Sequence, residues 1–145
     1  MYGRRARVGV VVPSTNTTVE PEFAAYLPPD VAVFATRVAV AEVASEEEKV
    51  ASLLAMHSQL DRAVAELASA GVAAIAYACT SGSFLGGRDS DQATCDDLTR
   101  AHGVPIVTTS SALVAALTAL RARKVALATP YVAPVADGAV TYLGQ

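Results

Sequence analysis

Several residue types and motifs that mark particular protein classes are scarce or absent in this chain. It has two cysteines, Cys79 and Cys95, and no tryptophan. Two cysteines are too few for a disulfide framework in a chain of 145 residues, so we expect a reducing, cytoplasmic compartment. Neither GxGxxG nor GxxxxGK[ST] occurs, which leaves the binding of a nucleotide phosphate without support.

Metal sites, nucleic acids and membranes also find little support. The chain has only two histidines, no His or carboxylate pair at metal-ligand spacing and no CxxC motif, so we predict neither metal nor cofactor. A net charge of −3 argues against nucleic acid as the main partner. No apolar run approaches the length of a membrane span, and the arginine-rich N-terminus lacks the layout of a signal peptide, so we expect no membrane partner.

The composition and the alternation of patterns predict an α/β fold. Apolar residues make up 52% of the chain and charged residues 17%, as in a globular domain. Helical patterns lie between short β-type runs, and the clearest begins at Ser45, where Glu48 completes a capping box, and ends at Gly71. We therefore predict a three-layer parallel sheet of four to five strands with helices on both faces and flavodoxin-like topology. The predicted strands are residues 8–12, 31–36, 72–77, 104–107 and 125–128.

Polar residues follow several of these strands, which places them on one rim of the sheet. Asn16, Cys79, residues 108–110 and Tyr131 all stand in such positions. Taken alone, Cys79 is as readily a small buried apolar residue as a nucleophile. The convergence on one rim favours the nucleophile. Because no general base stands beside it in the sequence, backbone donors, helix ends or a second chain would have to activate the thiol.

Three segments together resemble a known superfamily. They are VVPSTNTT at 11–18, YACTS at 77–81 and VALATPY at 125–131. They are similar to segments of the aspartate/glutamate racemase superfamily, and most similar to its branch of maleate cis-trans isomerases and arylmalonate decarboxylases. The resemblance implies one lobe of a two-lobe enzyme that acts on a small carboxylate without a cofactor.

The resemblance also implies residue roles. Cys79 corresponds to the catalytic cysteine, whose thiolate attacks the double bond of maleate in the isomerases. Asn16 corresponds to an asparagine that binds a substrate carboxylate, and Pro13 and Ser14, in the same turn, are expected to bind the substrate with it. Thr80 and Ser81 lie in a turn whose amides hold a carboxylate, and Tyr131 corresponds to a tyrosine near the second carboxylate. Since the decarboxylases have glycine in place of Cys79, an isomerase or racemase is favoured over a decarboxylase.

Members of the superfamily are much longer than this chain. We therefore expect residues 1–122 to form a first lobe and residues 123–145 to open a second lobe that is otherwise absent. A homodimer or higher homo-oligomer would supply a substitute wall for the site and cover the edge strand at 125–128. The alternatives are an aspartate/glutamate-type racemase, an arylmalonate-type decarboxylase, and a non-catalytic carboxylate-binding or interaction domain. A receiver domain is disfavoured because Pro13 to Asn16 provide no acidic cluster.

Overall fold

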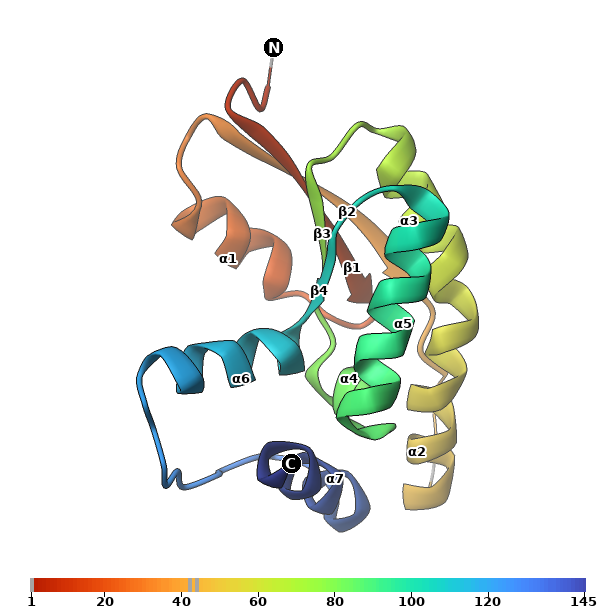
Figure 1. The fold of residues 1–145 in the computed structure, drawn as a ribbon. Helices are drawn as coiled ribbons and strands as arrows, with labels where there is room; N and C mark the ends of the chain where they lie inside the picture. Colours follow the sequence, from red (N-terminus) through yellow and green to blue (C-terminus); the bar gives the residue numbers. More distant parts are fainter. Residues whose placement is uncertain (1, 42, 44) are drawn as a thin grey trace.

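A parallel sheet lies at the centre of the molecule (Figure 1). The computed structural model describes residues 2–41, 43 and 45–145. Its described strands pair in the order β2-β1-β3-β4, and every pairing is parallel. The order is that of the flavodoxin-like fold, so the predicted class and topology are confirmed. The strands are β1 (Ala6–Pro13), β2 (Val31–Val38), β3 (Ala74–Tyr77) and β4 (Ile106–Thr108).

The central strand β1 is buried because it has a partner on each side and helices over its faces. Val10, Val11 and Val12 are all fully buried. A continuous run of β-branched residues is typical of such a strand, since neither face can be polar. The sequence prediction for residues 8–12 rested on this run and is confirmed.

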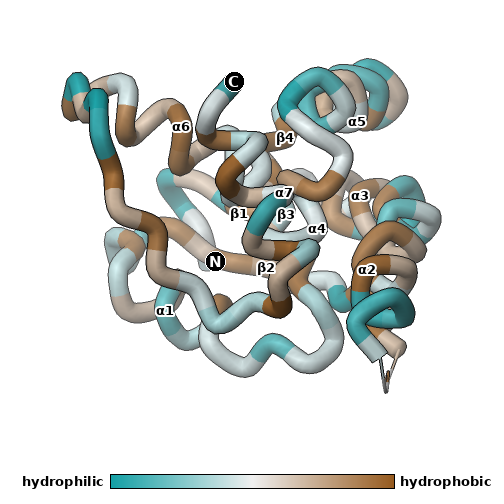
Figure 2. Tube along the Cα trace, turned by 90° about the horizontal axis from the view of Figure 1, so that it is seen from below, coloured by the Kyte–Doolittle hydropathy of each residue, from teal (hydrophilic) through white to brown (hydrophobic). Residues whose placement is uncertain are grey.

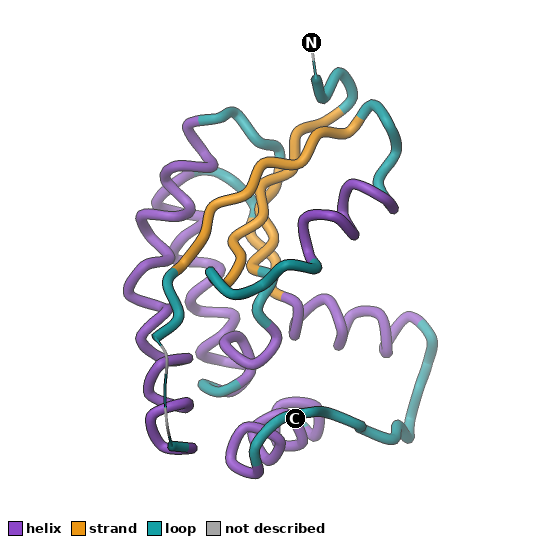
Figure 3. Tube along the Cα trace, turned by 180° about the vertical axis from the view of Figure 1, so that it is seen from behind, coloured by secondary structure: helices purple, strands orange, loops and turns teal. Residues whose placement is uncertain are grey.

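Helices cover both faces of the sheet (Figures 1 and 3). On one side α3 packs against β1 and β2, and α5 packs against β4 and α3; on the other side α1 contacts β2 and α6 contacts β4. Two further helices, α4 and α7, lie at the end of the sheet where β3 and β4 finish (Figure 1). The helices are α1 (Val19–Tyr26), α2 (Glu46–Ala55), the 3₁₀ turn η1 (Met56–Gln59), α3 (Leu60–Ser69), α4 (Thr80–Phe84), α5 (Gly87–His102), α6 (Thr109–Ala119) and α7 (Ala133–Gly144).

Local capping sets several helix ends. Ser45 and Glu48 form the predicted capping box at the start of α2. Thr108 caps α6 by accepting from the Ser111 amide, so that α6 begins at Thr109. The helix predicted from Ser45 to Gly71 is interrupted, because η1 separates α2 from α3.

The fifth strand predicted at residues 125–128 is wrong. This segment has no regular secondary structure, and Val125 and Leu127 are 51% and 43% exposed. In Figure 2 it runs outside the body of the molecule as an extended connection after α6. An apolar β-branched run becomes a strand only where a neighbouring backbone pairs with it, and none does so here. The argument that a homodimer covers this strand edge falls with it.

The C-terminal helix α7 nevertheless docks firmly on the first part of the chain. Its buried residues are Val135, Ala139 and Tyr142. The Tyr142 hydroxyl donates to Asp91 on α5 over 2.7 Å, and the Arg88 side chain donates to the Tyr142 carbonyl over 2.7 Å. These contacts bring the segment before α7, including Tyr131, close to the carboxyl ends of the strands.

Candidate functional site

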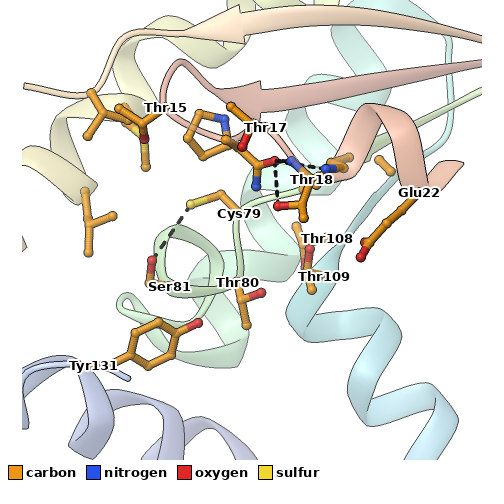
Figure 4. Close-up of a pocket in the computed structure, with 18 of the residues that line it drawn as sticks. Thr15, Thr17, Thr18, Glu22, Cys79, Thr80, Ser81, Thr108, Thr109 and Tyr131 are labelled. Carbon is orange, nitrogen blue, oxygen red and sulfur yellow. Dashed lines mark hydrogen bonds between the residues drawn. The ribbon is translucent and has the colours of Figure 1, made fainter. Parts of the chain in front are cut away.

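A large cavity lies where β1, β3 and β4 end. Its volume is about 1020 Å³, and it reaches from the loop after β1 to the start of α7. Figure 4 shows the polar and sulfur-bearing side chains that point into it. Of the predicted site residues, those lining it are Pro13, Asn16, Cys79, Thr80, Ser81 and Tyr131. Ser14 does not line it.

Cys79 stands at the point where β3 passes into α4. It is the N-cap residue of α4, its backbone is extended, and its side chain is only 6% exposed. Its sulfur lies 3.9 Å from the Ser81 hydroxyl oxygen (Figure 4). The turn predicted after Cys79 is thus the first turn of a short helix, whose initial N–H groups have no carbonyl partner within the helix.

The backbone of Thr80 is fixed by two serine hydroxyls. Ser83 donates to the Thr80 carbonyl over 2.9 Å and Ser110 donates to it over 3.2 Å, while the two hydroxyl oxygens lie 2.6 Å apart. Both serines are buried. With its carbonyl held on this inner side, Thr80 presents its side chain to the cavity beside Cys79 (Figure 4).

The loop after β1 orients Asn16 through its own backbone. The Asn16 Oδ1 accepts from the amides of Thr18 and Val19, each over 3.0 Å. Because those amides need an acceptor, the side-chain oxygen faces the start of α1. The other end of the side-chain amide, Nδ2, carries two N–H donors.

Ser14 has a structural position. Its backbone amide donates to Val38, and its hydroxyl accepts from the amide of Val40 over 3.0 Å. It therefore ties the loop after β1 to the end of β2.

Tyr131 lies on the opposite side of the cavity from the loop after β1. Its ring packs on Phe84 with centroids 5.8 Å apart. Figure 4 shows its hydroxyl turned toward the turn that carries Thr80 and Ser81. The cavity thus has hydrogen-bond donors on two sides of the Cys79 sulfur, an arrangement that suits a ligand with an acidic group at each end.

Comparison with known proteins establishes the family. The model of the family described as arylmalonate decarboxylase matches residues 8–145. The chain belongs to this family.

Relatives within the family are maleate isomerases as well as decarboxylases. A maleate isomerase from Nocardia farcinica is 37% identical over 146 residues, which cover 94% of this chain and 56% of the relative. One from Pseudomonas putida is 34% identical, over 96% of this chain and 58% of the relative. These matches confirm the resemblance to the branch of maleate isomerases and arylmalonate decarboxylases.

Solved structures of the family share this fold. A mutant of the Nocardia farcinica maleate cis-trans isomerase with a covalently bound succinylcysteine intermediate has a TM-score of 0.83 and 34% identity, over 96% of this chain and 58% of that one. A mutant of arylmalonate decarboxylase in the liganded form has a TM-score of 0.80 and 29% identity, over 96% of this chain and 57% of that one. The present chain therefore spans a little over half the length of the family members that it matches.

Two charged residues in the cavity were not expected from the sequence. Lys49 on α2 and Glu22 on α1 both line it. A cation at this place would attract a carboxylate ligand. The run of three glutamates before Lys49 identified a helix start, and nothing in it indicated which side chain would face the site.

Arg37 and Tyr77 were also missed. The contacts of Arg37 are with residues distant in sequence, and Tyr77 was read only as the last apolar residue of a strand. Arg37 on β2 donates to the carbonyls of Ser14 and Asn16 over 3.1 and 2.8 Å and pairs with Glu20. Tyr77 is the last residue of β3, two residues before Cys79, and is buried. Cys95, by contrast, lies on α5 outside the cavity. In the part of the chain that the structure describes, no cluster of His, Cys, Asp or Glu has the geometry of a metal site, and no helix is long and apolar enough to cross a bilayer.

Proposed function

We propose that this chain carries the nucleophilic half of an isomerase site for a small cis-dicarboxylate such as maleate. The observation that carries the proposal is the position of Cys79, at a strand end and between donors from the loop after β1 and from the first turn of α4. Two related isomerase structures, one with a covalently bound succinylcysteine intermediate and one with maleate, support the same chemistry.

We assign the following roles to the residues of the cavity, and the geometry supports them. The Asn16 amide would hold one carboxylate, and Tyr131 would hold the other from the opposite side. Thr80 and Ser81 would donate from the first turn of α4. Lys49 would add a favourable charge. The alkene would then lie against the Cys79 sulfur.

The chemistry balances without an oxidant or a reductant. The thiolate electron pair forms a C–S bond to one alkene carbon, and the π pair passes to the other carbon, which takes a proton. The former double bond is now single and rotates. Loss of that proton reforms the double bond in the trans geometry and expels the thiolate, so the product is an isomer of the substrate.

The second alkene carbon also needs a proton donor. Cys79 contributes the only thiol to the cavity among the described residues. We therefore propose that residues 1–122 form the first lobe, that residues 123–145 correspond to the opening of a second, and that the acid belongs to an opposite wall. That wall would come from the remaining length seen in the relatives or from a second copy in a homodimer.

A second candidate is a carboxylate-binding domain without turnover, and the single thiol in the cavity favours it. Incubation of the chain with maleate, with the reaction followed by ¹H NMR, distinguishes the isomerase from the binding domain. Fumarate formation that disappears in Cys79→Ser supports the isomerase. A maleate adduct on Cys79 without fumarate supports a nucleophile that lacks its acid. Thermal stabilisation by maleate with neither product supports binding alone, and the absence of any stabilisation refutes both.

Racemisation and decarboxylation are tested in the same way. Aspartate in D₂O would lose its Cα proton signal under a racemase, and an arylmalonate would release CO₂ under a decarboxylase. We expect neither reaction, because Cys79 occupies the position that the resemblance assigns to glycine in the decarboxylases and because a cis-dicarboxylate fits donors on both sides of the sulfur.

The compartment is part of the proposal. Both cysteines are free thiols. A nucleophilic thiol persists in a reducing environment and is oxidised outside it. We therefore infer that the protein acts in the cytoplasm, which fractionation of cells would test.

A further inference from the structure

The Tyr77 hydroxyl is buried without a hydrogen-bond partner among the residues that the structure describes. The side chain is 3% exposed. Buried hydroxyls are almost always hydrogen-bonded, so an unpaired one indicates an acceptor that is engaged only in another state of the protein. The question is which group near Tyr77 can become such an acceptor.

Geometry points to the sulfur of Cys79. Tyr77 and Cys79 are two residues apart, so an extended backbone places their side chains on the same side. A Cβ placed on Gly82 would lie 2.5 Å from the Tyr77 hydroxyl oxygen and 3.0 Å from the Cys79 sulfur. The two atoms therefore border the same small space, which stays open because residue 82 has no side chain.

We propose that the Tyr77 hydroxyl donates a hydrogen bond to the Cys79 thiolate and so positions and stabilises the nucleophile. A neutral thiol is a weak acceptor, whereas a thiolate is a strong one. Deprotonation of Cys79 thus supplies the missing partner of a buried donor. Tyr77 is a positioning residue that acts through the sulfur. The inference rests on the proposed function only in taking Cys79 as the nucleophile.

Tyr77 is held in its donor form. Burial raises the pKa of the Tyr77 phenol far above its ordinary value, and the negative charge of a Cys79 thiolate raises it further. The phenol therefore keeps its proton at every pH at which Cys79 would act. It serves as a fixed hydrogen-bond donor and not as a general base.

Other groups around the pair are few and can be controlled for. The Ser81 hydroxyl lies 3.9 Å from the sulfur, and either group can be the donor in that contact. His57 meets Tyr77 edge-on, with ring centroids 6.2 Å apart. The other titratable or charged residues that face the pair or its cavity are Asp91, Lys49, Glu22 and Tyr131.

The test is the rate at which iodoacetamide alkylates Cys79, measured by mass spectrometry of the Cys79 peptide across a range of pH. Tyr77→Phe keeps the ring and removes the donor. We expect the alkylation rate near neutral pH to fall by about tenfold, and the pH dependence to move up by about one unit. No turnover is needed, so this outcome is independent of whether maleate is isomerised.

Tyr142→Phe is the matched control, because it also removes a buried tyrosine hydroxyl, here one bonded to Asp91. We expect its Cys79 alkylation profile to match that of the unaltered chain. Equal profiles for Tyr77→Phe and the unaltered chain, or an equal displacement in both variants, would overturn the proposal.

A second measurement covers the case in which Tyr77→Phe does not fold. The unaltered chain is labelled with 3-fluorotyrosine, and the Tyr77 ¹⁹F resonance is identified by elimination from Phe variants of the other four tyrosines. We expect this resonance to titrate together with Cys79 alkylation and to lose that titration in Cys79→Ser. A Tyr77 resonance that ignores the state of Cys79 refutes the hydrogen bond.

Discussion

The Arg37 guanidinium donates to the carbonyl oxygen of Asn16 over 2.8 Å. It so links β2 to the loop that carries Asn16, the residue predicted to bind a substrate carboxylate. The same nitrogen donates to Ser14 over 3.1 Å, and the other terminal nitrogen pairs with Glu20 on α1. One side chain thereby fixes the loop after β1, the helix that follows it and the neighbouring strand. Asn16 is therefore held through its backbone carbonyl by Arg37 and through its side chain by the amides at the start of α1.

The first prediction concerns this link. Arg37→Met keeps the aliphatic stem and removes the hydrogen bonds, so we expect the loop to loosen and maleate affinity to fall several-fold. Because the guanidinium is partly exposed, the free energy of unfolding should fall by only about 0.5–1 kcal/mol. Isothermal titration and urea denaturation measure the two effects. Arg100→Met, which breaks a more exposed pair with Asp97, is the control and should change neither quantity.

The second prediction separates the two roles of Asn16. Asn16→Asp retains an oxygen for the amides of Thr18 and Val19, and its negative charge suits the start of α1. It also replaces the Nδ2 donors with a second acceptor that repels a carboxylate.

We therefore expect the thermal unfolding temperature of Asn16→Asp to stay close to that of the unaltered chain, while maleate affinity falls by at least about tenfold. Asn16→Ala should lose both stability and affinity. Retention of maleate binding in Asn16→Asp would show that this side chain does not face the carboxylate.

Much of this arrangement was predictable from the sequence, because parallel strands place their carboxyl ends on one edge. Knowing that Cys79 and Asn16 each follow a strand was enough to bring them to one cavity. The position of Arg37 was not predictable, since its partners depend on which residue of β2 lies beside Pro13 in the sheet. The run at 125–128 was misjudged for a related reason, because the apolar pattern says nothing about whether a neighbouring strand is present. Tyr77 read as the last apolar residue of a strand, and only the packing around Gly82 shows where its hydroxyl lies.

The third prediction concerns the pH dependence of stability. Burial, followed by the charges of Asp91 and Asp96, raises the pKa of the Cys95 thiol to about 11. The pKa of a cysteine thiol in an unfolded chain is about 8.5. The folded chain therefore holds this proton to a higher pH than the unfolded chain does. The contribution of the protonated thiol to the free energy of unfolding is complete below about pH 8.5 and is lost as the pH rises toward about 11.

We expect ionisation of this thiol to lower the free energy of unfolding by about 2 kcal/mol between about pH 8 and about pH 10.5. Urea denaturation of the unaltered chain and of Cys95→Ala at both values measures it. The variant loses packing at every pH, but its free energy of unfolding should decline less steeply with pH. Parallel declines would mean that Cys95 titrates alike in the folded and unfolded chains.

The fourth prediction uses the space beside the sulfur. In Gly82→Ala the new methyl group would meet the Tyr77 hydroxyl at 2.5 Å and the Cys79 sulfur at 3.0 Å, so one of them must move. The Met56 Cε atom lies 3.3 Å from the same added methyl group and leaves little room for that movement. We expect a loss of about 1–3 kcal/mol in the free energy of unfolding, together with slower alkylation of Cys79.

Gly144→Ala is the matched control, because a Cβ there meets nothing within 4 Å. Its stability should stay within about 0.5 kcal/mol of that of the unaltered chain, and its Cys79 alkylation should be unchanged. If Gly82→Ala is equally neutral in both measurements, the sulfur and the phenol are not confined as described. A variant that is destabilised but alkylated at the normal rate would mean that the methyl group displaces Tyr77 and that the thiolate does not depend on it.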